Sequence, residues 1–234
     1  MSYFLSTQNL TTATNPEIFG EEFRHLISRR VKKGEVFYFQ DQSGERHECE
    51  ILAVNKNSIQ IKPRKKIKVP NVPEKYVVLF LSVISEKSLD YVFQKTTELG
   101  VGKIVIFNSE NTALKLTEAK FKNKHGRWNK ILWEACKQSD RQFPPTLTYL
   151  PNLDLALEEV KDLDLVYLCD CEGGGSLESK NKKIGVMIGP EGGFTDKERF
   201  QIKQKKNTSV LKLSENILKA DTASIVGVSL LINN

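Results

Sequence analysis

The residues best suited to chemistry lie in a glycine-rich stretch late in the chain, residues 188–195, which reads IGPEGGFT. The glycines at 189, 192 and 193 allow close approach to the backbone, so a ligand can reach main-chain N–H and C=O groups. An apolar run comes before the stretch, and Thr195 with Glu198 has the spacing of a capping box at a helix start. Strand, loop and helix in this order hold small molecules in α/β proteins, whereas a tight turn without a ligand is the alternative for this stretch alone.

A second segment, residues 213–223 with the sequence LSENILKADTA, comes one helix and one strand later and leads into an apolar C-terminal helix. Together with IGPEGGFT it resembles the pair of signatures of the RsmE family of ribosomal RNA methyltransferases. That family belongs to the SPOUT superfamily of trefoil-knotted, S-adenosylmethionine-dependent enzymes. Further matches follow the family's order, so the resemblance covers nearly the whole chain: His25-Leu26, residues 30–34, QKTTELGV at 94–101, Ser109-Glu110 and EACKQSDR at 134–141.

The chain departs from the family pattern at four positions. Ser214 replaces a glycine, Lys219 an arginine and Asp221 a glutamate, and Asn111 stands where an arginine usually follows Ser-Glu. Lysine keeps the charge of arginine but loses its bidentate fork. These changes leave the reaction class intact and alter the hydrogen bonding around the site.

The resemblance implies the fold, the reaction and the partners. We expect an α/β fold: a PUA-like β-barrel RNA-binding domain over residues 1–70, then a SPOUT trefoil-knot methyltransferase domain with a parallel sheet over residues 74–234. The implied reaction is methylation of uridine N3 in 16S (small-subunit) ribosomal RNA, with S-adenosylmethionine as cofactor. The implied enzyme is a cytoplasmic homodimer in contact through Ile225 to Ile232, and its substrate is the RNA or the small subunit.

The resemblance also implies the residues of the site. The expected cofactor pocket consists of Cys169, Glu172, Ile188, Gly189, Glu191, Gly192, Gly193, Leu213, Ser214, Ile217, Leu218 and Thr222. Uridine N3 becomes a better nucleophile as its proton leaves, so a cation near O2 or O4 and a proton acceptor are needed. Lys219 or Arg141 could supply the charge, and Asp221 or Glu191 the acceptor. A solvated helix start is the alternative for Lys219 and Asp221.

The net charge of +6 is concentrated in clusters. Basic clusters bind polyanions because each neutralised phosphate releases counterions. The predicted RNA contacts are Arg29, Arg30, Lys32, Lys62, Arg64, Lys65 and Lys66; a third basic cluster spans residues 120–130. A lysine-rich solvated surface is the alternative for the charge. A non-catalytic RNA-binding assembly factor and a SPOUT enzyme acting on transfer RNA are the alternatives for the function.

Composition argues against several other classes. Four scattered cysteines and three histidines predict no disulfide framework and no metal site. No apolar run reaches the roughly 20 residues that span a bilayer, so we expect no membrane partner. The sequence around Gly100 lacks the complete phosphate-loop pattern, and the glycine-rich loop comes too late for a Rossmann dinucleotide site.

The pattern of elements changes near residue 76. Before it, short alternating strands at 35–39, 47–54 and 58–62 follow a helix at 21–29, and Pro63, Pro70 and Pro73 are expected to bracket a linker. After it, buried strands alternate with helices, which is typical of a parallel sheet. The expected strands are 77–84, 103–107, 146–149, 165–169, 184–188 and 210–213, and the expected helices 89–99, 120–139, 154–161, 197–205 and 221–231.

Overall fold

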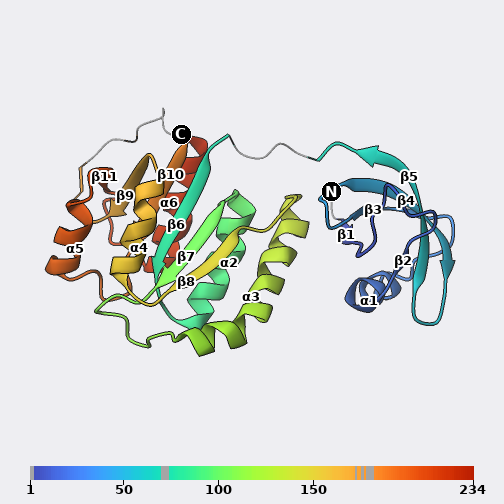
Figure 1. Ribbon diagram of the computed structural model, residues 1–234, viewed down its shortest axis with the longest axis horizontal. Helices are drawn as coiled ribbons and strands as arrows, with labels where there is room; N and C mark the ends of the chain where they lie inside the picture. Colours follow the sequence, from blue (N-terminus) through green and yellow to red (C-terminus); the bar gives the residue numbers. More distant parts are fainter. Residues whose placement is uncertain (1–2, 70–73, 172, 175–176, 178–181) are drawn as a thin grey trace. The chain divides into compact units, whose positions relative to one another are not determined.

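The computed structural model describes residues 3–69, 74–171, 173–174, 177 and 182–234. The chain divides into two compact units (Figure 1). The first unit comprises Met1–Asn71 with Cys136–Phe143, and the second comprises Val72–Ala135 with Pro144–Asn234. Within the described ranges, the strands form a five-stranded sheet in the first unit and a six-stranded sheet in the second.

The first unit is a curled, mixed sheet around a small apolar core. Its elements are β1 (Phe4–Leu5), β2 (Glu17–Ile18), α1 (Gly20–Ser28), β3 (Val36–Gln40), β4 (Arg46–Val54) and β5 (Ile59–Ile67). The strand order is β1-β3-β4-β5-β2, and all pairs except β1 with β3 are antiparallel. Leu26, Phe39 and Ile51 are fully buried at its centre, so the alternating apolar positions of these strands face one core.

The expectation that Pro63 begins a linker is wrong. Strand β5 continues through Pro63 to Ile67 and carries most of the basic run on its exposed positions. The pairing of β5 with β4 shifts register next to Pro63, between Glu48 and Cys49. A β-bulge of this kind is one of the few places in a sheet that accepts proline.

Residues 136–143, at the end of a long helix, belong to the first unit. The Tyr3 hydroxyl donates to the carbonyl of Arg141 at 2.6 Å, and the Gln40 side chain donates to the carbonyl of Gln142 at 2.6 Å. Arg46, which is buried, forms an ion pair with Asp140, and its guanidinium lies over the Tyr3 ring. The short segment therefore completes the first unit through polar contacts that its own sequence does not reveal.

The second unit is a parallel α/β sheet in the strand order β11-β9-β10-β6-β7-β8. All five strand pairs are parallel. Its strands are β6 (Tyr76–Ser82), β7 (Lys103–Phe107), β8 (Thr146–Leu150), β9 (Leu165–Cys169), β10 (Lys183–Ile188) and β11 (Thr208–Leu211). Its helices are α2 (Glu86–Leu99), α3 (Glu118–Ser139), α4 (Leu153–Glu159), the short η1 (Val160–Asp162), α5 (Asp196–Lys203) and α6 (Ala220–Asn233).

Helices cover both faces of this sheet (Figure 1). Successive strand residues point to opposite faces, so Leu79 packs with α2, α3 and α6, whereas Phe80 packs with α4 and α5. Both side chains are fully buried. Near-continuous apolar strands follow from this three-layer arrangement, because each face needs its own apolar row.

Parallel strands bring their carboxyl ends to one edge of the sheet, and the loops at that edge are well held. The loop after β6 ends at Ser85, the N-cap residue of α2, whose hydroxyl accepts the Ser88 N–H. Buried hydroxyls of Ser82, Ser109 and Thr112 bond to one another and fix the loop after β7. None of the helices in the described part of the chain is long and apolar enough to cross a membrane.

Candidate active site

A cavity of about 350 Å³ lies where the carboxyl ends of β9 and β10 meet the start of α6. The two segments singled out by sequence, 188–195 and 213–223, come together in its walls. Ligand sites in open α/β sheets lie at this edge, and their volumes run from about 300 to 1,000 Å³. The lining residues are Cys169, Asp170, Cys171, Ile188, Gly189, Pro190, Glu191, Gly193, Phe194, Arg199, Ile217, Leu218, Lys219, Ala220 and Ala223.

The glycine-rich loop owes its shape to two glycines and to a helix cap. Gly193 has φ of +69°, and a Cβ on Gly189 would lie 3.2 Å from the backbone nitrogen of Phe194. Thr195 and Glu198 form the predicted capping box of α5, with the Thr195 N–H donating to Glu198 at 2.9 Å. Main-chain groups at the helix start are thus fixed beside the cavity, and the capping-box prediction is confirmed.

Gly192 faces the loop after β7. A Cβ at this position would lie 3.3 Å from the Cβ of Asn111, whose side-chain amide donates to the carbonyls of Gly192 and Gly193 at 3.3 and 3.1 Å. The buried carboxylate of Glu198 also accepts the Glu110 N–H at 2.9 Å. Asn111, which replaces the usual arginine of the family pattern, therefore stabilises the glycine-rich loop through hydrogen bonds to its backbone.

Glu191 and Lys219 bring opposite charges to the cavity wall. One carboxylate oxygen of Glu191 accepts the Ser85 N–H at 3.1 Å, which orients the side chain. Lys219 is the N-cap residue of α6, and its side chain makes no capping hydrogen bond. In the described part of the chain no carboxylate is paired with Lys219, so its ammonium can meet negative charge on a ligand.

Asp221 and Thr222 follow Lys219 at the start of α6 but do not line the cavity. The Asp221 carboxylate accepts the Ser88 hydroxyl at 3.3 Å and the Thr222 N–H at 2.7 Å. Neither side chain is among the described residues that line the cavity. Asp221 therefore links the start of α6 to α2, and a direct role in proton transfer stays a prediction.

A smaller chamber of about 80 Å³ adjoins the cavity and includes Leu213 and Ser214 in its lining. Cys169 and Leu218 line both chambers. Burial raises the pKa of the Cys169 thiol, with the Asp170 charge adding to the effect, so the sulfur stays protonated at neutral pH. Cys169 therefore offers an uncharged surface rather than a nucleophile.

Among the charged residues of the lining, Arg199 was not predicted. It stands one helical turn after the N-cap Thr195, and its side chain lies 3.9 Å from that of Asp170, which follows β9. The spacing from Thr195 to Arg199 is the i, i+4 spacing that puts both residues on one helix face. That spacing is the signal that could have identified Arg199.

Two further predicted site residues are not among those that the structure describes as lining the cavity. Glu172 falls outside the described residues. Arg141 belongs to the first unit, where burial lowers the pKa of its guanidinium, although arginine stays charged at any ordinary pH. Its catalytic role stays a prediction.

The cavity suits a ligand that is partly apolar and carries both signs of charge. Ile188, Leu218 and Ala223 offer apolar surface, and the glycine-rich loop offers main-chain groups. Asp170 and Glu191 can face a cation, and Arg199, which also pairs with the exposed Asp196 at 2.7 Å, can face a carboxylate. Lys219 adds a second positive charge to the wall. This set fits a zwitterionic sulfonium such as S-adenosylmethionine better than it fits a polyphosphate. Among the described residues, no cluster of His, Cys, Asp and Glu could hold a metal ion.

The predicted RNA contacts of the first unit are exposed, but only some of these basic side chains are paired with a carboxylate. Arg64 pairs with Glu50 at 2.7 Å, and Lys66 pairs with Glu45. Lys62 and Lys65 have no carboxylate partner in the residues described. Arg29, Arg30 and Lys32 lie on exposed backbone around the end of α1, with Arg29 over the Phe4 ring. Lys62 and Lys65 are therefore the β5 cations best able to meet a polyanion.

Family models match both parts of the chain. An RNA methyltransferase domain matches residues 72–232, and an RNA methyltransferase PUA domain matches residues 19–64. Among curated proteins, the chain is 32% identical to ribosomal RNA small subunit methyltransferase E of Mesomycoplasma hyopneumoniae, covering 74% of this chain and 76% of that protein. It is 30% identical to the protein of the same name from Aquifex aeolicus, covering 91% of each.

Solved structures show the same fold over both units. A ribosomal RNA small subunit methyltransferase E of Neisseria gonorrhoeae bound to S-adenosyl methionine superposes with a TM-score of 0.84 at 24% identity, covering 98% of this chain and 96% of that one. A Legionella pneumophila protein in complex with the bound cofactor SAM gives 0.88 at 23% identity, with the same coverage. The expected fold class, a SPOUT methyltransferase domain preceded by a PUA-like barrel, is confirmed.

Proposed function

Because the chain belongs to the RNA methyltransferase family whose domain model matches residues 72–232, we propose that it methylates N3 of a uridine in 16S ribosomal RNA. The names of the relatives, ribosomal RNA small subunit methyltransferase E, support the substrate. The observation that carries the proposal is the meeting of both signature segments, 188–195 and 213–223, in one cavity.

We propose S-adenosylmethionine as the methyl donor, held in this cavity. When bound, it supplies a methyl group on a sulfonium, so the protein has mainly to position two reactants and exclude water. The apolar residues Ile188 and Leu218 would enclose the cofactor, and the loop 189–193 would bond it through main-chain groups. Asp170 and Glu191 offer negative charge to its cationic parts, and Arg199 faces its carboxylate.

The uracil ring loses its N3 proton as the methyl group arrives. Glu191 is the acceptor that the geometry favours, because it lines the cavity and only one of its carboxylate oxygens accepts the Ser85 N–H. Lys219 can stabilise the charge that develops on uracil O2 or O4. Asp221 acts as a positioning residue that fixes the turn carrying Lys219.

We assign RNA binding to the first unit, which matches the PUA domain model. We propose that the active form is a cytoplasmic homodimer. Leu230 on α6 is partly exposed, and Tyr91 on α2 is half exposed. These exposed side chains support a dimer contact through the layer formed by α2 and α6. Light scattering of the purified chain tests the dimer directly. A monomer that is fully active would contradict this assignment.

Single-turnover methyl transfer tests the reaction. The purified chain with S-adenosylmethionine is offered immature subunits, complete small subunits, naked 16S RNA or transfer RNA. Transfer to uridine N3 of ribosomal RNA supports the proposal. RNA binding without transfer to any substrate favours an assembly factor, and transfer to transfer RNA alone favours the other alternative.

A further inference from the structure

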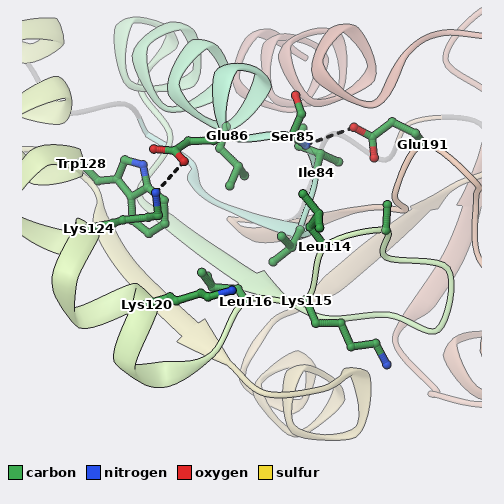
Figure 2. Close-up of a pocket in the computed structure, with 13 residues that line it drawn as sticks. Ile84, Ser85, Glu86, Leu114, Lys115, Leu116, Lys120, Lys124, Trp128 and Glu191 are labelled. Carbon is green, nitrogen blue, oxygen red and sulfur yellow. Dashed lines mark hydrogen bonds and ion pairs between the residues drawn. The ribbon is translucent and has the colours of Figure 1, made fainter.

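A second cavity, of about 490 Å³, is larger than the first and shares Glu191 with it. Figure 2 shows the residues that line this second cavity. It is formed by the loops after β6 and β7, the start of α2 and one face of α3. Its lining residues are Val83, Ile84, Ser85, Glu86, Leu89, Ala113, Leu114, Lys115, Leu116, Lys120, Lys124, Trp128 and Glu191. None of the roles proposed above uses this cavity except through Glu191.

The wall of the second cavity is largely apolar, and neighbouring side chains hold its Trp128 in place. Trp128 is 1% exposed and is held edge-on by Phe93 at 5.5 Å and by its indole N–H bond to Asp90 at 3.1 Å. Leu114, in contrast, is 83% exposed. A large apolar side chain exposed at the mouth of a rigid apolar cavity is typical of a surface that meets a ligand.

The charge of the cavity favours an anion. Glu86 is neutralised by Lys124 at 2.5 Å and by Arg127 at 2.6 Å. Lys120 has no carboxylate partner in the part of the chain that is described, and its side chain runs toward the cavity beside Leu116 (Figure 2). Lys115 extends outward from the rim. An apolar wall edged by lysines that lack a carboxylate partner among the described residues matches a nucleotide, which has a flat base and a phosphate.

Glu191 joins the two cavities, since its side chain lines both and is bound to Ser85. The loop that carries Leu114 is tied to the glycine-rich loop through Asn111. Two cavities that share a wall residue suit two neighbouring nucleotides of one RNA strand. Presenting a base requires unstacking it, so the flanking base also loses a stacking partner.

On the premise of the proposed methyl transfer, we propose that the second cavity binds the nucleotide that flanks the target uridine. Its base lies against Leu114, Leu116 and Ile84, and its phosphate meets Lys120. The cavity compensates for the lost stacking and sets which base can follow or precede the target. Sequence preference at one flanking position is the functional consequence.

Two variants test the site by RNA binding. Leu114→Ser removes apolar contact with the base and is expected to weaken binding of a target-containing RNA hairpin about tenfold. Lys120→Gln is expected to lower the slope of log K against log salt by about 0.7. Lys122→Gln, which removes one charge from the same helix at a residue paired with Glu118, is the matched control and is expected to leave the slope unchanged. Cofactor affinity, measured by calorimetry, should not change in any variant.

Photocrosslinking identifies the bound nucleotide. Hairpins carrying 4-thiouridine at the target or at either neighbour are irradiated with the wild-type chain, and the linked peptides are identified by mass spectrometry. The inference predicts that a flanking position links to residues 113–120 and that the target does not. Linkage of the target to 113–120, absence of any link there, or equal effects of Lys120→Gln and Lys122→Gln would overturn it. Failure of the proposed function would appear separately, as absence of methyl transfer by the wild-type chain.

Discussion

Replacing Lys219 by alanine separates catalysis from stability. Lys219 is exposed, makes no side-chain cap bond and has no carboxylate partner among the residues described. Its removal should therefore change the free energy of unfolding by no more than about 0.5 kcal/mol. It should also leave cofactor affinity largely intact, because the apolar walls and the glycine-rich loop remain.

The rate of methyl transfer should fall much more. Once RNA covers the cavity, the ammonium would face developing charge on the uracil in a site shielded from water. Loss of one such charged contact costs about 10²–10³ in rate, or about 2.7–4 kcal/mol. Lys219→Arg restores the residue usual in the family and should keep or raise activity. Lys197→Ala, an exposed lysine of α5 that lies outside the cavity lining, is the control.

Single-turnover assays with saturating cofactor measure this rate, and urea unfolding measures stability. A Lys219→Ala rate within threefold of wild type, with unchanged stability, would refute the assigned role. A loss of rate accompanied by an equal loss of cofactor affinity would move Lys219 from catalysis to binding.

Three further predictions concern the loop, the cap and the barrel. Gly189→Val should abolish cofactor binding measured by calorimetry, because even a Cβ at this position would lie 3.2 Å from Phe194. Gly192→Val should weaken binding less, because its side chain would displace only Asn111. Equal cofactor affinities of both variants and the wild type would show that the loop is not part of the site. Thr195→Ala should lower the free energy of unfolding by about 1 kcal/mol in urea titrations, since it removes one half of the capping box; an unchanged midpoint would count against it. The double variant Lys62→Gln, Lys65→Gln should reduce the slope of log K for RNA binding against log salt by roughly 0.7–0.9 per contact. Arg64→Gln should reduce this slope by less, because Glu50 already pairs with Arg64. Identical slopes for all variants and the wild type would favour a solvated surface that does not bind RNA.

Local patterns in the sequence predicted much of the second unit. The bounds of β7 and β9 coincide with the expected strands, and the Thr195–Glu198 capping box forms as its spacing predicts. These features depend on neighbours within a few residues, so periodicity and capping chemistry reveal them. The meeting of the segments around Gly189 and Leu218 is a long-range contact, and it was accessible only through the family resemblance.

The remaining features depend on how distant segments fold against each other. Pro63 fits a strand because β5 bulges next to it, at Arg64, and the end of α3 joins the first unit through Tyr3 and Arg46. The second cavity combines Leu114 with Glu191, which are far apart in the chain. Neither composition nor spacing could indicate these contacts, because each requires the path of the chain in space.

Mass spectrometry of nucleosides from purified 16S RNA can show whether this chain places a methyl group on uridine N3. The comparison is between a strain with and a strain without the gene for this chain. We expect 3-methyluridine to disappear from the deletion strain, to return with the wild-type chain and to stay much reduced with Lys219→Ala. Equal amounts of 3-methyluridine in both strains would show that this chain does not carry out the methylation.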